Sequence, residues 1–120
     1  MTRKVLVVED EPVLAAMIQS RLESNQYEVS IAGNGLEGLK QIERAKPDLI
    51  VMDIAMPQMD GYTLAKMLRS RIEFKEIPVI VVTAKGNQLK SLFELEGITD
   101  YLIKPFQAQE LLERVKKHIG

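Results

Sequence analysis

The chain has 120 residues, and we expect residues 1–120 to form one domain around one hydrophobic core. The apolar fraction is 46%, the charged fraction is 28% and the net charge is −1, so no basic field favours direct binding to nucleic acid or to a membrane. The absence of cysteine excludes disulfides, thiol catalysis and cysteine-bound metals. No apolar run approaches the ~20 residues of a membrane span. Met1-Thr2-Arg3-Lys4 leads straight into a predicted strand without a signal peptide, so we expect a cytoplasmic location.

The first half of the chain predicts three strands and two helices from its apolar periodicity. In order, these are a strand at 5–8, a helix at 12–24 that starts at Pro12, a weaker strand at 27–32, a helix from about Leu36 that stops before Pro47, and a strand at 49–53. The helical spacing of the apolar residues predicts that these side chains point inward: Leu14, Met17, Ile18, Leu22, Leu36, Leu39 and Ile42.

The second half continues the alternation. It predicts a helix capped by Asp60, a strand at 78–84, a short helix at 87–96 stopped by Gly97, a strand at 101–103 and a helix at 108–119. The expected inward side chains of the first and last of these helices are Leu64, Met67, Leu68, Ile72, Leu111, Leu112, Val115 and Ile119.

Five strands alternating with five helices predict an α/β fold with a doubly wound parallel sheet. The strands are continuous apolar runs, as expected when helices cover both faces of a sheet. Right-handed crossovers leave few topologies, and strand order 2-1-3-4-5 is a common solution. That flavodoxin-like order places the carboxyl ends of the first and third strands side by side.

Polar side chains follow four of the five predicted strands. The first strand ends in Glu9-Asp10-Glu11, the third in Asp53, the fourth in Thr83 and the fifth in Lys104. The carboxyl ends of parallel strands share one edge, where open α/β sheets bind ligands. Unpaired carboxylates there would repel one another, and a hard cation such as Mg²⁺ relieves that repulsion.

Asp10 and Asp53 could supply two carboxylate ligands to Mg²⁺, and a loop carbonyl near Ala55 a third. Lys104 is a point charge suited to a phosphoryl oxygen, and the Thr83 hydroxyl is a neutral donor. The set therefore predicts a phosphoryl site with a carboxylate nucleophile. The alternative is a structural ion cluster in which Lys104 only neutralises the carboxylates.

Several short motifs occur together, in one order and at characteristic separations. They are Val7-Val8-Glu9-Asp10-Glu11, Met52-Asp53 with Met56-Pro57 and Met59-Asp60-Gly61, Val82-Thr83-Ala84, and Asp100-Tyr101-Leu102-Ile103-Lys104-Pro105-Phe106. With them the whole chain resembles the receiver domain of bacterial two-component response regulators, the CheY-like family.

The resemblance implies that Asp53 accepts a phosphoryl group from a phosphohistidine on a sensor histidine kinase or phosphotransfer protein. It implies that Glu9, Asp10, Asp53 and the Ala55 carbonyl hold Mg²⁺. The protein would then be a signalling switch that catalyses only its own phosphorylation and dephosphorylation. Glu9 stands where aspartate is more usual in the family, which lengthens its reach toward the metal.

The resemblance also implies a switch. Thr83 and Lys104 would bind the phosphoryl oxygens, Tyr101 would turn inward when Thr83 moves, and the Lys104–Pro105 bond would be cis. Partner proteins or a second copy would bind the surface of the fourth helix, fifth strand and fifth helix. Residues 85–96 depart from the family pattern, with Glu96 on the apolar face, and we expect this helix to be loosely held.

Two other functions compete with this interpretation. A flavodoxin-like cofactor protein would need Ser, Thr or Gly in its first loop, whereas Glu9-Asp10-Glu11 would repel a phosphate. A receiver-like interaction module that is never phosphorylated would not need Asp10, Asp53, Thr83 and Lys104 together. His118, the one histidine, is expected at the surface, favoured by the helix dipole, with no catalytic role.

Overall fold

The computed structural model describes residues 2–54, 59–84 and 98–120. The predicted helix at 87–96, its terminator Gly97 and the proposed ligand Ala55 lie outside these ranges. The elements are β1 (Lys4–Val8), α1 (Pro12–Glu23), β2 (Glu28–Ala32), α2 (Gly35–Arg44), β3 (Leu49–Asp53), α3 (Gly61–Arg69), β4 (Val79–Thr83), β5 (Asp100–Ile103) and α5 (Ala108–Ile119).

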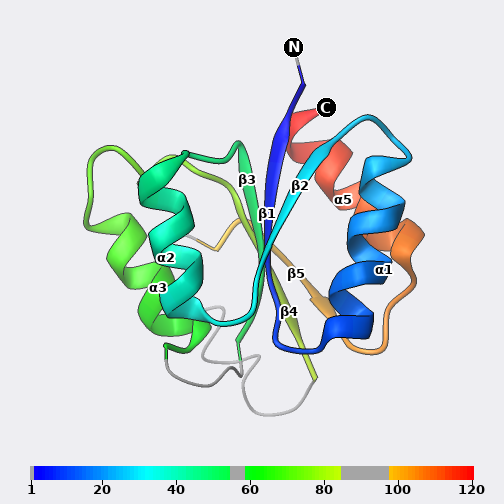
Figure 1. The fold of residues 1–120 in the computed structure, drawn as a ribbon, viewed down its shortest axis with the longest axis horizontal. Helices are drawn as coiled ribbons and strands as arrows, with labels where there is room; N and C mark the ends of the chain where they lie inside the picture. The colour runs from blue at the N-terminus through cyan, green and yellow to red at the C-terminus, as the bar shows by residue number, and fades with distance from the viewer. Residues whose placement is uncertain (1, 55–58, 85–97) are drawn as a thin grey trace.

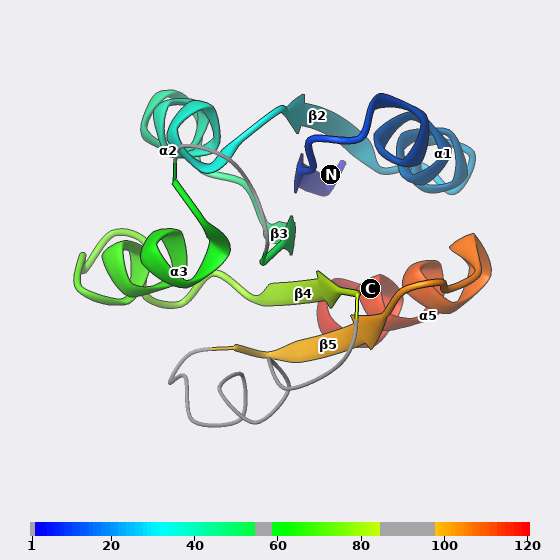
Figure 2. The same ribbon diagram turned by 90° about the horizontal axis from the view of Figure 1, so that it is seen from below.

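The five strands form one parallel sheet in the order β2-β1-β3-β4-β5, as predicted. Helices α2 and α3 cover one face, and α1 and α5 cover the other (Figure 1). Figure 2, seen from below, looks onto the carboxyl edge of the sheet and shows the strands in this order. None of the described helices is long and apolar enough to cross a membrane.

Each face of the sheet has its own apolar core. Leu6 and Val8 of β1 belong to the cluster under α2 and α3, while Val5 and Val7 belong to the cluster under α1 and α5. All four side chains are at most 3% exposed. Successive strand residues point to opposite faces, so a strand buried on both faces must be a continuous apolar run.

Local signals set the helix boundaries. Pro12 is the first residue of α1, and the Asn34 side chain accepts a hydrogen bond from the Glu37 amide at 2.8 Å to start α2. Asp60 caps α3 as predicted, accepting from the Thr63 amide at 2.8 Å. At the edge of the sheet, Gln41 of α2 donates a side-chain hydrogen bond to the Ile31 carbonyl of β2 at 3.0 Å.

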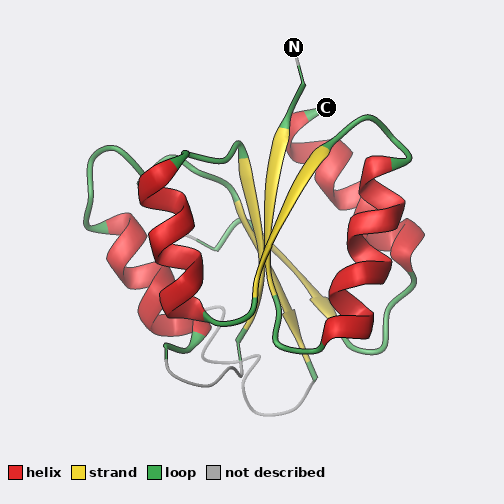
Figure 3. Ribbon diagram, viewed as in Figure 1, coloured by secondary structure: helices red, strands yellow, loops and turns green. Residues whose placement is uncertain are grey.

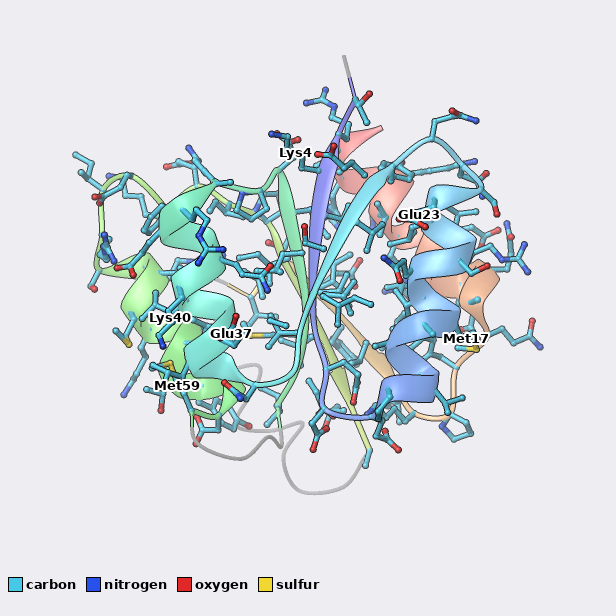
Figure 4. The ribbon with its side chains drawn as sticks, viewed as in Figure 1. Lys4, Met17, Glu23, Glu37, Lys40 and Met59 are labelled. Carbon is cyan, nitrogen blue, oxygen red and sulfur yellow. The ribbon has the colours of Figure 1, made fainter. Side chains whose placement is uncertain are left out.

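Three predicted core residues are exposed, and those predictions were wrong. Met17 is 40% exposed and Leu36 41% exposed, because each lies one position beside the buried stripe of its helix. Figure 4 shows Met17 on the side of α1 away from the strands. Ile72 is 81% exposed because α3 already ends at Arg69, so the residue falls in the loop that Figure 3 draws after the helix.

Candidate functional site

Three carboxylates meet where β1 and β3 end. Val8 pairs with Met52 across the two strands, so the chains leave the sheet side by side into Glu9-Asp10 and Asp53. One carboxylate oxygen from each of Glu9, Asp10 and Asp53 lies within 4.8 Å of the others. Glu9 and Asp53 are 2% and 6% exposed, whereas Asp10 faces solvent.

Lys104 reaches this cluster from the end of β5, where the Lys104–Pro105 peptide bond is cis, as predicted. Its Nζ lies 2.8 Å from Asp53 Oδ2, 3.2 Å from Glu11 Oε2 and 3.3 Å from Glu9 Oε1. Burial alone would lower the pKa of the ammonium, but the hydrogen bond and charge of Asp53, with the other two carboxylates, raise it above its ordinary value. The lysine therefore stays a cation.

Glu9 carries a charge in a poorly solvated place. Burial raises the pKa of its carboxyl and the Asp53 charge adds to this, while the Glu11 amide, donating to Oε2 at 3.1 Å, and Lys104 act in the opposite direction. Glu9 Oε1 is buried, and in the described part of the chain its polar neighbour is the Lys104 ammonium at 3.3 Å, an ion pair without hydrogen-bond geometry. A buried anionic oxygen beside two further carboxylates is a donor set that fits a hard divalent cation such as Mg²⁺.

Thr83 lies on β4, the strand next to that of Asp53, and Tyr101 lies on β5, on the far side of β4. Thr83 ends β4, is buried, and its carbonyl accepts from the Lys104 amide at 2.6 Å. Tyr101 is half-buried in β5 and packs against the core under α2 and α3. The structure thus brings five predicted site residues to one edge: Glu9, Asp10, Asp53, Thr83 and Lys104.

Gly61 lets α3 begin directly against the strand that carries Asp53. Its amide donates to the Ile54 carbonyl at 3.0 Å. A Cβ at this position would lie 2.8 Å from the Asp53 carbonyl oxygen and 3.0 Å from the Ile54 Cα, distances at which backbone must shift. Glycine is therefore required at position 61, where the first turn of α3 passes close to the backbone of Asp53 and Ile54.

Sequence reasoning missed a second polar cluster, at the start of β5. The Asp100 carboxylate accepts hydrogen bonds from Arg114 of α5 and from the Tyr101 amide, and it lies 2.9 Å from His118 Nε2. Arg114 also donates to the Tyr101 carbonyl at 3.2 Å. His118 lies in the last turn of α5, where the helix dipole favours it as expected, but its side chain is only 17% exposed. The spacing of Arg114 and His118, four residues apart on one helix face, was the available signal.

Comparisons with known proteins identify the family. A family model described as "Response regulator receiver domain" matches residues 5–116, and the chain belongs to this family. The chain is 41% identical over 118 residues to the alkaline phosphatase synthesis transcriptional regulatory protein PhoP of Bacillus subtilis, covering 97% of this chain and 48% of that protein. It is 40% identical to the sensor histidine kinase TmoS of Ectopseudomonas mendocina, covering 98% of this chain and 12% of that protein.

Solved structures agree. A putative response regulator from Chloroflexus aurantiacus has 39% identity and a TM-score of 0.90, covering 98% of this chain and 97% of that one. The receiver domain of sensor histidine kinase PA1611 from Pseudomonas aeruginosa, with a magnesium ion in its active-site cleft, has 32% identity and a TM-score of 0.89, covering 100% and 99%. The chain is thus a receiver domain of the two-component response regulators with the flavodoxin-like CheY fold, which favours this class over the cofactor-protein alternative.

Proposed function

We propose that residues 1–120 form a single receiver domain that accepts a phosphoryl group onto Asp53. The donor is a phosphohistidine on a sensor histidine kinase or phosphotransfer protein. One observation carries the proposal: the Lys104 ammonium lies 2.8 Å from Asp53 Oδ2, inside a cluster that also holds the Glu9 and Asp10 carboxylates. A nucleophilic carboxylate beside a fixed cation is what phosphoryl transfer needs, because positioning and charge neutralisation supply most of the catalysis.

In the transfer step an Asp53 carboxylate oxygen attacks phosphorus. A P–O bond forms as the P–N bond to the donor imidazole breaks, and the imidazole nitrogen keeps the electron pair and takes up a proton. Lys104 and Thr83 bind the phosphoryl oxygens. Hydrolysis of the acyl phosphate by water restores Asp53 and releases inorganic phosphate, so the protein's chemistry is confined to its own phosphorylation and dephosphorylation.

Glu9, Asp10, Asp53 and the carbonyl of Ala55 are the proposed Mg²⁺ ligands. When bound, the cation would neutralise charge on the carboxylates and the incoming phosphoryl group. Asp10 faces solvent, so a cation would reach its carboxylate first. Glu9 would contribute the buried Oε1 as a further ligand.

Phosphorylation would then change the surface made of the predicted helix at 87–96, which lies outside the described residues, together with β5 and α5. Thr83 would move toward the phosphoryl group and Tyr101 would fill the space it leaves. This surface would control binding of a downstream protein or of a second copy, in the cytoplasm. The half-buried position of Tyr101 in β5, against the core under α2 and α3, supports the placement of this binding surface.

Intact-mass spectrometry after incubation with acetyl phosphate tests the proposal. We expect the mass of one phosphoryl group to be added only with Mg²⁺ present, and Asp53→Asn to abolish it. Asp48→Asn, which removes a carboxylate near the start of β3, is the matched control and should still be phosphorylated. An unchanged wild-type mass would favour the competing interpretation, an interaction module in which Lys104 only neutralises its three carboxylate neighbours.

A further inference from the structure

Lys104 is held by three carboxylates, and they are not equivalent. The side chains of Glu9 and Asp53 are 1% and 8% exposed, whereas that of Glu11 is 63% exposed. Glu9 and Asp53 belong to the carboxylate cluster that could hold a cation; Glu11 does not. Of the three, Glu11 is therefore the one that an incoming phosphodonor meets first.

Glu11 also lies between the carboxylate cluster and a neighbouring surface groove. It lines a groove with Leu14 and Met17 of α1 and with Phe106, and Lys104 forms the wall of that groove next to the acidic cluster. Its amide donates to Glu9 Oε2 at 3.1 Å, which fixes the backbone. The side chain, with its Oε2 3.2 Å from Lys104 Nζ, thus places a negative charge at the mouth of the site.

We propose that Glu11 is a specificity-determining residue that selects phosphodonors by their charge. The inference rests on the proposed function, since Lys104 must turn from carboxylates to phosphoryl oxygens during transfer. The Glu11 carboxylate competes with the phosphoryl group for the Lys104 ammonium and repels anionic donors. A dianion such as acetyl phosphate is repelled more than a monoanion such as phosphoramidate, whose P–N bond resembles that of phosphohistidine.

The test compares phosphorylation rate constants for these two donors at saturating Mg²⁺ in wild type, Glu11→Gln and Glu11→Asp. An exposed charge interaction of ordinary strength predicts that Glu11→Gln accelerates acetyl phosphate about two- to fivefold. Phosphoramidate, with half the charge, should gain only the square root of that factor, about 1.4- to 2.2-fold. Glu11→Asp keeps the charge and should keep the wild-type ratio of the two rate constants.

Glu113→Gln is the matched control, because it removes the same charge from an exposed position on α5 and should change neither rate constant. Raising KCl to about 0.5 M should shrink the effect of Glu11→Gln by screening. Mg²⁺ affinity, measured by calorimetry, should change less than about threefold, since Glu11 lies outside the proposed ligand set.

Equal acceleration of both donors by Glu11→Gln, or none, would overturn the selection by charge while leaving Asp53 phosphorylation intact. A tenfold loss of Mg²⁺ affinity in that variant would make Glu11 a metal ligand instead. If neither donor phosphorylates the wild-type protein, the proposed function fails and this inference fails with it. The mass of the wild-type protein after incubation separates this outcome from a failure of the charge selection alone.

Discussion

Gly61 lies so close to Asp53 that a Cβ on the glycine would come within 2.8 Å of the Asp53 carbonyl oxygen. We expect Gly61→Ala to destabilise the protein by about 1–3 kcal/mol, the usual result of overpacking a rigid site, and to slow phosphorylation by displacing the carboxylate. Denaturant unfolding and the acetyl phosphate rate measure the two effects. Gly33→Ala is the control, because a Cβ there meets nothing within 4 Å; equal losses in both variants would contradict the argument.

Glu9→Gln should make the metal-free protein more stable. Burial raises the pKa of the Glu9 carboxyl, so the ionised form costs stability, and this cost appears as the pH rises above the ordinary pKa. At neutral pH we expect the melting temperature to increase by about 2–6 °C, the shift that ~1 kcal/mol produces in a small domain. The variant should gain less from added Mg²⁺ than wild type. A lower melting temperature without metal would show that the contact with Lys104 outweighs burial.

Asp10→Asn should weaken Mg²⁺ binding about tenfold, since losses of this order follow when groups at a metal site are altered. Asp10 faces solvent, so its removal should leave folding stability nearly unchanged. Calorimetric titration with Mg²⁺ gives the affinity and thermal unfolding gives the stability. An unchanged affinity would exclude Asp10 from the metal's ligands.

Lys104→Met should have the opposite effect on the metal. The ammonium occupies Asp53 and Glu9, so its removal leaves anions without their internal cation and should tighten Mg²⁺ binding about tenfold. The same variant should be phosphorylated poorly, because nothing replaces the cation that binds the phosphoryl oxygens. Lys40→Met removes a lysine exposed on α2, labelled in Figure 4, and should leave the affinity unchanged. Weaker binding in Lys104→Met would mean that the lysine orders the ligands instead of competing with the metal.

Asp100→Asn should give a pH-dependent loss of stability. Burial alone would raise the pKa of the Asp100 carboxyl, but hydrogen bonds from His118 and the Tyr101 amide and the charge of Arg114 hold it below its ordinary value of 3.8. A carboxyl with a lowered folded-state pKa stabilises the protein above its unfolded-state pKa, and that contribution is lost as the pH falls through the folded-state value.

Urea unfolding of wild type and Asp100→Asn should therefore differ most at about pH 5 and least at about pH 3. Glu113→Gln is the control on the exposed side of α5. Its difference from wild type in the free energy of unfolding should not shrink between about pH 5 and about pH 3. A difference that stays constant over this interval would assign the effect of Asp100 to packing and not to its charge.

Most of the fold could be predicted because its determinants are local. The apolar runs at Val5 and Leu49 can be buried only between two helix layers, while Pro12 starts a helix by its fixed backbone and Asp60 by its side-chain cap. The errors at Met17 and Ile72 have another origin. Periodicity does not give the width of an apolar stripe, which for Met17 is set by how α1 packs against the sheet. Nor does it give the length of a helix, and α3 stops at Arg69, before Ile72.

The candidate site was predictable to the same extent. Topology alone brings the strand ends to one edge of the sheet, which leaves Asp53 within reach of the long Lys104 side chain across β4. The contact of Glu11 with Lys104 depends on the rotamer of an exposed side chain, and no periodicity encodes it. The pairing of Asp100 with His118 depends on how α5 lies against β5, which is settled by the packing of Leu111 and Val115.

Both outer strands of the sheet have outward backbone groups occupied by the protein's own side chains. On β2, Gln41 donates to the Ile31 carbonyl; on β5, Asp100 and Arg114 take the amide and carbonyl of Tyr101. An open edge recruits strands from other chains and leads to aggregation. These bonds occupy part of each outer edge and so disfavour pairing of strands between copies there, whereas contacts between side-chain surfaces separate again when a charge is added or removed. A reversible signal requires contacts of that kind, because main-chain pairing between sheets would outlast the phosphoryl group.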